Sequence, residues 1–346
     1  MRPTLTLFYK ERPKPAHSRV SILWIYNNYF AMNRQILLSL MLLFGISLSA
    51  QEGHHFVFHY GLTIKDVPAS ATVRVWIPAA HSDPFQEVKV LSATGDLPFK
   101  MTRESRFNNQ MFYAQTAKSD KPEIHFEIAY DVVRHERLTL GAATPHLADV
   151  TIKDKERKQF LEPDKLAPVT GPLLELAAKA TDGMKTPLEK ARAIYDYVFE
   201  NMKYDAAASE HADALVAADL KKGDCVDFHS LFIAMARSQS IPARFEIGFA
   251  VPDHSGEITG YDCWAEFFEP IHGWVPIDIS QASLHPEKKD FFFGAHEANR
   301  VQFTVGRDIV LNPKQDGTPL NYFVYPYVEV GGKPYSNVSW AFSVTE

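Results

Sequence analysis

The stretch Gly223-Asp224-Cys225-Val226-Asp227-Phe228-His229 decides the fold of this chain and its chemistry. Apolar residues continue after it at three- and four-residue steps to about residue 238, and Pro242 follows, so the sequence predicts a buried helix that begins at Cys225. At that position free backbone N–H groups and the helix dipole favour the thiolate of Cys225, the form that attacks carbonyl groups. A buried structural cysteine is the alternative, because cysteine is among the most buried residue types.

Three further segments follow in order along the chain. They are Ile241-Pro242-Ala243-Arg244, Cys263-Trp264-Ala265-Glu266-Phe267 and Gly273-Trp274-Val275-Pro276-Ile277-Asp278. Together with the first stretch they resemble the core of the transglutaminase-like superfamily, over roughly residues 170–285. The resemblance implies a papain-like fold, with Cys225 as the nucleophile and Asp278 as the acid that orients a catalytic histidine. It also implies acyl transfer or hydrolysis at glutamine amides or peptide bonds through a thioester.

The sequence departs from the family pattern at the catalytic base. The family carries its histidine directly before the Cys-Trp-Ala-Glu segment, where this chain has Asp262. A carboxylate is a weak base for a thiol, since the reference pKa values are about 4 and about 8.5, and its charge would raise the pKa of Cys225. His229, four residues after Cys225 on the same helix face, is the best substitute on distance, although its ring can equally pack in the core. His254 and His272 lie in expected loops, and nothing in their spacing brings them to the site.

The second cysteine, Cys263, lies in an expected strand. The two-residue period of a strand places Asp262, Trp264 and Glu266 on one face and Cys263 on the other. If Asp262 faces the cleft, as the resemblance implies, Cys263 faces away from it. We therefore expect no disulfide between Cys225 and Cys263.

The residues before and after these motifs predict the domain organisation of the chain. Residues 51–135 contain short runs of β-branched and aromatic residues separated by turn-forming stretches, which predicts an N-terminal β-sandwich. Residues 136–170 are mixed and charged and indicate a connector. Residues 171–346 are expected to form the transglutaminase-like core with C-terminal strands. Its helices come first, one of them after the capping signal Thr186-Pro187, and its strands follow, so the fold class is α+β.

The N-terminal residues indicate an export signal. Residues 32–50 combine a basic start, an apolar run of about thirteen residues and a small-residue exit, which is typical of a signal peptide cleaved near Ala50. The run is shorter than the ~20 residues of a membrane-spanning helix, and a short buried helix is the alternative. Residues 1–31 precede a convincing start and indicate an over-called start codon. We expect a secreted or periplasmic protein without a transmembrane span.

Composition limits the remaining classes of function. The 346 residues include 36 Lys and Arg against 42 Asp and Glu, a formal charge of −6, which argues against a nucleic-acid-binding protein. Two cysteines exclude a disulfide-rich scaffold. His54, His55 and His59 fit a solvated strand face better than a metal site, so we expect no metal and no cofactor.

Three hypotheses remain open. The first is a secreted cysteine acyltransferase or peptidase that acts on a protein or peptide substrate and is impaired by Asp262. The second is a non-catalytic relative that uses the same cleft to bind a peptide or a cell-wall ligand. The third, weaker hypothesis is a structural module whose terminal β regions mediate assembly.

Overall fold

The computed structural model describes residues 53–140, 150–208 and 213–346. The expected signal peptide at 32–50 and the upstream residues 1–31 lie outside the described residues. None of the described helices is long and apolar enough to cross a membrane.

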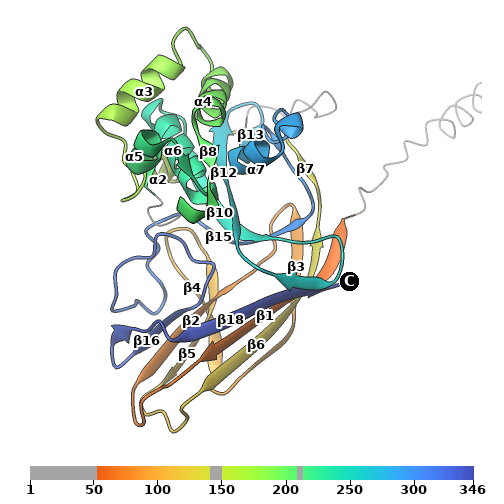
Figure 1. The fold of residues 1–346 in the computed structure, drawn as a ribbon, viewed down its shortest axis with the longest axis vertical. Helices are drawn as coiled ribbons and strands as arrows, with labels where there is room; N and C mark the ends of the chain where they lie inside the picture. The colour runs from red at the N-terminus through yellow and green to blue at the C-terminus, as the bar shows by residue number, and fades with distance from the viewer. Residues whose placement is uncertain (1–52, 141–149, 209–212) are drawn as a thin grey trace, which may run out of the picture. The chain divides into compact units, whose positions relative to one another are not determined.

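Two five-stranded antiparallel sheets face each other around an apolar core (Figure 1). The order in the first sheet is β11 (Gly256–Ile258), β18 (Val338–Thr345), β1 (His54–Ile64), β6 (Ile124–Arg134) and β3 (Gln86–Gly95). The order in the second sheet is β17 (Lys333–Pro334), β16 (Tyr327–Val330), β2 (Val73–Ala79), β5 (Gln110–Thr116) and β4 (Phe99–Arg103). Every second residue of β1 from Phe56 to Ile64 is buried, as a strand with one face on the core requires.

The C-terminal strands belong to these two sheets. β18 pairs with β1, with Val57 opposite Thr345, and Figure 1 shows the blue C-terminal strand beside the orange first strand. β16 pairs with β2. The sequence led us to group these strands with the core at 171–346, whereas the structure places them in the sandwich. A two-residue hydrophobic period identifies a strand but not the strand with which it pairs, which explains the difference.

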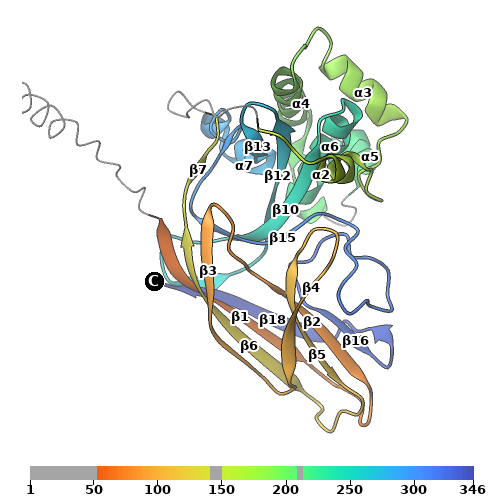
Figure 2. The same cartoon turned by 180° about the vertical axis from the view of Figure 1, so that it is seen from behind.

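The predicted α+β core is confirmed (Figure 2). Its sheet has the order β13 (Gly273–Ile277), β12 (Asp262–Glu269), β10 (Ala243–Ala250) and β15 (Arg300–Val305). Helix α6 (Cys225–Ser238) lies against β12 and β10, and Phe232 contacts Phe267 with ring centroids 6.2 Å apart. The other helices are α2 (Asp154–Leu161), α3 (Pro172–Ala180), α4 (Pro187–Asn201), α5 (Ala214–Leu220) and α7 (Ile279–Leu284). Every residue of α6 from Cys225 to Arg237 is buried, so this helix is the centre of the core.

Local sequence signals located some elements and missed others. The capping box at Thr186 and Glu189 is present, so the predicted start of α4 is confirmed. The expected connector contains α2, and β15 ends at Val305, because Gly306 takes a positive φ of 87°. The smaller elements are β7 (Arg137–Leu138) with β14 (Ala295–His296), β8 (Lys203–Tyr204) with β9 (Lys222–Gly223), η1 (Ala206–Ala208) and η2 (Pro286–Lys288).

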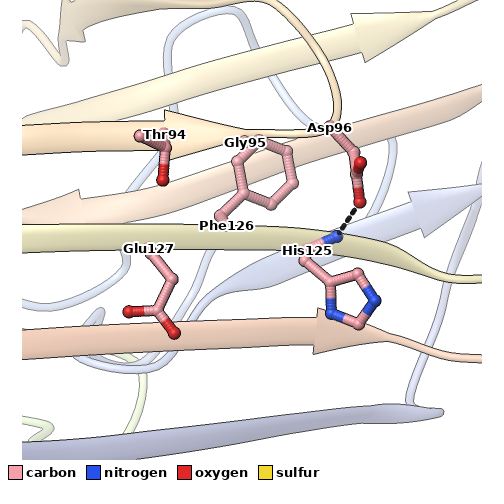
Figure 3. Close-up of a pocket in the computed structure, with 6 residues that line it drawn as sticks. All are labelled: Thr94, Gly95, Asp96, His125, Phe126 and Glu127. Atoms are coloured by element: carbon pink, nitrogen blue, oxygen red, sulfur yellow. Dashed lines mark hydrogen bonds between the residues drawn. The ribbon is translucent and has the colours of Figure 1, made fainter.

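A shallow pocket of about 290 Å³ lies on the sandwich between β3 and β6 (Figure 3). Asp96, one of its two acidic lining residues, accepts a hydrogen bond from the backbone N–H of His125 at 2.8 Å and pairs with Lys121. The Asp96 carboxylate therefore holds the turn in place and is already occupied by protein groups.

The histidines of β1 make contacts between neighbouring strands. His55 Nε2 lies 2.6 Å from Asp131 Oδ1, and His59 Nε2 lies 3.3 Å from Thr345 Oγ1. No group of three side chains able to hold a metal ion occurs among the residues that the structure describes.

Candidate active site

Cys225 is the first residue of α6, and the helix end beneath it is already capped. The carboxylate of Asp224 accepts hydrogen bonds from the backbone N–H groups of Val226 at 2.8 Å and Asp227 at 3.3 Å. The side chain of Asp227 in turn accepts the N–H of Asp224 at 3.1 Å. The Cys225 side chain is buried, with the residue 5% exposed. Two of the backbone N–H groups that we expected to face the Cys225 sulfur thus donate to the Asp224 carboxylate instead.

The surroundings of Cys225 oppose thiolate formation. Burial raises the pKa of Cys225 to about 11, and the negative charges of Asp262, Asp224 and Asp278 act in the same direction. A contact with the Cys263 thiol acts in the opposite direction but does not compensate. The thiol is therefore neutral near pH 7, so the helix end does not activate it as the sequence led us to expect.

Cys263 faces Cys225, contrary to the expectation that it faces away. Its thiol contacts the Cys225 thiol, and its Sγ lies 3.6 Å from His229 Nδ1. The strand alternation itself is as expected, because Trp264 on the opposite face donates to Glu246 at 2.7 Å. What the alternation could not show is that α6 covers the face carrying Cys263. Both cysteines are free thiols.

Asp262 stands at the position where the resemblance expects the catalytic histidine. It is 7% exposed, and its Oδ1 accepts the backbone N–H of Cys263 at 2.9 Å. Burial, together with the negative charge of Asp278, raises the pKa of Asp262 to about 7, whereas the positive charge of Arg300 acts to lower it. Near neutral pH this carboxyl group therefore gains and loses a proton readily.

Asp278 is buried and its oxygens are occupied. Oδ1 accepts hydrogen bonds from Ser280 Oγ at 2.8 Å and from the backbone N–H of Gln281 at 3.0 Å, so the carboxylate caps α7. Oδ2 accepts a hydrogen bond from Arg300 Nη1 at 3.1 Å. Asp278 thus binds a guanidinium and a helix end, where the resemblance implies that it orients an imidazole.

His229 is fully buried and also engaged. Its Nε2 accepts the backbone N–H of Ile279 at 3.1 Å and lies 3.8 Å from Asp278 Oδ1. Because Nε2 accepts, the ring proton is assigned to Nδ1, the nitrogen that faces Cys263. Burial lowers the pKa of His229 to about 4 even though Asp278 lies close by. The imidazole joins α6 to α7 and has no basic nitrogen directed at Cys225.

Of the two loop histidines, His272 pairs with Glu269, its Nδ1 lying 2.7 Å from Glu269 Oε2. The structure thus brings Cys225, Asp262, Asp278 and His229 into one site. The imidazole of His229, however, is bound to the backbone N–H of Ile279.

Three residues of the site were not predicted from the sequence. Arg300 opens β15, stacks over Trp264 with 4.8 Å between its Cζ and the ring centroid, and binds Asp278. Tyr261 donates its O–H to Asp224 at 3.0 Å. Tyr204 lies close enough for the charges of Cys225 and Asp224 to contribute to raising its pKa to about 12, burial being the larger cause. Only Tyr261 had a local signal, because it directly precedes Asp262.

A cleft opens beside Asp262. It has a volume of about 450 Å³ and is lined by Tyr204, Tyr261, Asp262, Gln281 and residues 250–252 and 257–260. A ligand in this cleft would contact Asp262 directly. Both residues are buried, but Asp262 lines the cleft and Cys225 does not, so the cleft presents a carboxyl group to the ligand and not a thiol.

Comparisons with known proteins agree with this architecture. Residues 174–279 match the family described as the transglutaminase-like superfamily. An uncharacterized protein of Haemophilus influenzae is 26% identical over 320 residues, which cover 81% of this chain and 86% of that protein. The uncharacterized protein YebA of Bacillus subtilis is 25% identical over 130 residues, 32% of this chain and 18% of YebA. A candidate cysteine protease from Cytophaga hutchinsonii, with a TM-score of 0.53 at 16% identity, shares the fold over 85% of this chain and 92% of its own.

Proposed function

Because residues 174–279 form a transglutaminase-like core, we propose that the chain uses the cleft of that core to bind a peptide or protein ligand, and that acyl transfer at Cys225 is impaired. One observation carries this proposal. Asp262 places a carboxyl group near Cys225, where a base would act. The imidazole of His229 is occupied, because its Nε2 accepts the Ile279 N–H. A positioned general base is typically worth ~10²–10⁴ in rate, and its loss leaves the binding cleft intact.

A second candidate function is slow acyl transfer with Asp262 as the base. Asp262 has a pKa of about 7, which lies in the range that suits general-base catalysis near neutral pH. In this reaction the Cys225 thiol gives its proton to the Asp262 carboxylate while the sulfur attacks the carbonyl carbon. Asp262 then returns the proton to the leaving amine, and water or a second amine resolves the thioester.

The direction of the two pKa shifts disfavours this second candidate as the main activity. The thiol pKa of about 11 lies well above the carboxyl pKa of about 7, so transfer of the proton from Cys225 to Asp262 is uphill. A free imidazole and an activated thiol would remove most of that cost. We therefore infer weak thiol chemistry and place the main role of the cleft in binding.

We also propose that the protein works outside the cytoplasm, in the periplasm or as a secreted protein. The support is the composition of residues 32–50, with cleavage near Ala50. N-terminal sequencing of the protein from an exported fraction tests this point. A mature chain that retains residues 32–50 would contradict it.

The proposed function is tested by turnover of glutamine-containing peptides, measured as released ammonia and as cleaved peptide. We expect the wild-type chain to turn over no faster than Cys225→Ala, and Asp262→His to exceed both. Asp262→Asn is the matched control, because it removes the charge without adding a base. Wild-type turnover well above that of Cys225→Ala would overturn the impaired-site proposal.

A further inference from the structure

The cleft beside Asp262 is one part of a longer trough. A second hollow of about 390 Å³ is lined by Glu257, Ile258 and Thr259 together with residues 340–343. The same residues 257–259 line the cleft, so the two hollows adjoin along β11. A third hollow of about 540 Å³ adjoins the cleft at Tyr204. The trough thus extends from Tyr204 past Asp262 to Trp340.

Four aromatic residues line the trough, Tyr204, Tyr261, Trp340 and Phe342, and two further tyrosines pack against them. Tyr261 contacts Tyr322 and Tyr325, with ring centroids 5.5 and 5.7 Å apart. Tyr325 stacks on Trp340 at 4.5 Å with the ring planes 26° apart. Trp340 is 42% exposed and Tyr204 is 37% exposed, so large aromatic surfaces remain open to a ligand at both ends.

The two hollows along β11 carry charge of one sign. Asp262 and Glu257 line the two hollows along β11, and none of their described lining residues is basic. The lysines Lys203, Lys221 and Lys222 all belong to the third hollow, beyond Tyr204. An acidic wall with exposed aromatic faces attracts a cation in two ways. The carboxylates attract its charge, and the rings make cation–π contacts with it.

The backbone of β11 adds a means of holding an extended chain. β11 stands at the end of its sheet and pairs with β18 alone in that sheet, with Glu257 opposite Ser343. The other edge of β11 is therefore open within the sheet, and an extended peptide can add to such an edge by main-chain hydrogen bonds.

We propose that the trough binds an extended peptide segment that carries a lysine or arginine side chain over Glu257, Asp262 and the aromatic wall. The backbone of the segment runs along β11, and its basic side chain lies between the carboxylates and the rings. This inference rests on the proposed function in taking the cleft as a ligand site, and it adds the chemical class of the ligand. It requires no reaction at Cys225.

The experiment is fluorescence anisotropy with the full chain and three labelled eight-residue peptides of alternating Val and Thr. Their central residue is Lys, Gln or Glu. At low ionic strength we expect the Lys peptide to bind about tenfold more tightly than the Glu peptide, with the Gln peptide between them. Equal affinity for all three peptides, or tighter binding of the Glu peptide, would overturn the proposal.

Two variants assign the effect to the trough. Glu257→Gln and Trp340→Ala should each weaken the Lys peptide about two- to fivefold, and Glu257→Gln should not weaken the Glu peptide, since it removes a like charge. Glu87→Gln is the matched control, because Glu87 is an exposed carboxylate on β3, at the far end of the same sheet order. If Glu87→Gln weakens the Lys peptide as much as Glu257→Gln does, the preference is a general effect of acidic charge and the trough is not the site.

Failure of this inference and failure of the proposed function give different results. Rapid wild-type turnover of glutamine peptides would overturn the proposed function while leaving the preference for the Lys peptide in place. Loss of the charge preference in a chain without turnover would overturn this inference alone.

Discussion

Cys225 should react with iodoacetamide about 30-fold more slowly than an ordinary thiol near pH 7.5, from its ionisation and its intrinsic nucleophilicity together. An ordinary thiol with a pKa of about 8.5 is about 10% thiolate at this pH. With a pKa of about 11, Cys225 is about 0.03% thiolate, roughly 300-fold less. The more basic thiolate is intrinsically about tenfold more nucleophilic, since nucleophilicity rises with pKa with a Brønsted coefficient of about 0.4–0.5.

The assay follows alkylation by mass spectrometry in Cys263→Ala, where Cys225 is the one remaining cysteine of the chain. The rate in denaturant gives the reference for an ordinary thiol. Burial of the side chain lowers the rate by the same factor at every pH, whereas ionisation sets the pH at which the rate levels off. The two effects can therefore be separated in one pH series.

The logarithm of the rate should rise with a slope near one up to about pH 10 and should not level off below it. Asp262→Asn in the same background should raise the rate about three- to tenfold near pH 7.5, because it removes a negative charge that raises the thiol pKa. A rate that levels off below about pH 8 would refute the reasoning, because it would mean that Cys225 is activated.

The remaining predictions concern His229, Asp262 and Thr186. His229→Gln should leave the pH dependence of Cys225 alkylation unchanged, and a shifted midpoint would make His229 its base. The pKa of His229 is about 4 in the fold against about 6.5 unfolded, so the unfolded state gains a proton first. In urea denaturation, the difference in stability between the wild-type chain and His229→Gln should therefore fall by up to about 3 kcal/mol as pH drops from about 6.5 to 4, and taking the difference cancels the opposite contribution of Asp262. The pKa of Asp262 is raised to about 7, so its contribution to stability is present below about pH 4 and is lost as pH rises toward 7. Asp262→Asn should then stabilise the chain by about 2–4 kcal/mol more at pH 8 than at pH 4, and an equal effect at both would contradict the raised pKa. Thr186→Ala should cost about 1 kcal/mol of unfolding free energy with no change in peptide binding, since it removes only the cap of α4.

The sequence was informative where a local pattern has one structural meaning. A helix that begins at Cys225 needs only the apolar period and the following Pro242, and α6 spans Cys225–Ser238. The capping box at Thr186 is similar, because both of its partners lie within four residues. The order of four motif segments was enough to identify the core that residues 174–279 match.

Contacts between segments that are distant along the chain could not be predicted from the sequence. Arg300 binds Asp278 from 22 residues further along, and no spacing rule links a strand residue to the cap of a preceding helix. The alternation of β12 assigned Cys263 to a face correctly but could not say that α6 covers that face. The pKa values of Cys225 and Asp262 depend on burial, which is a property of the assembled core.

Acylation of Cys225 by an activated phenyl ester, followed by intact mass, tests most directly whether the site lacks a working base. The comparison is between the wild-type chain and Asp262→His near pH 7.5, each in the Cys263→Ala background. The account predicts that the histidine variant acylates at least about a hundredfold faster. Equal rates, or a faster wild-type chain, would show that the carboxyl group already serves Cys225 as a base.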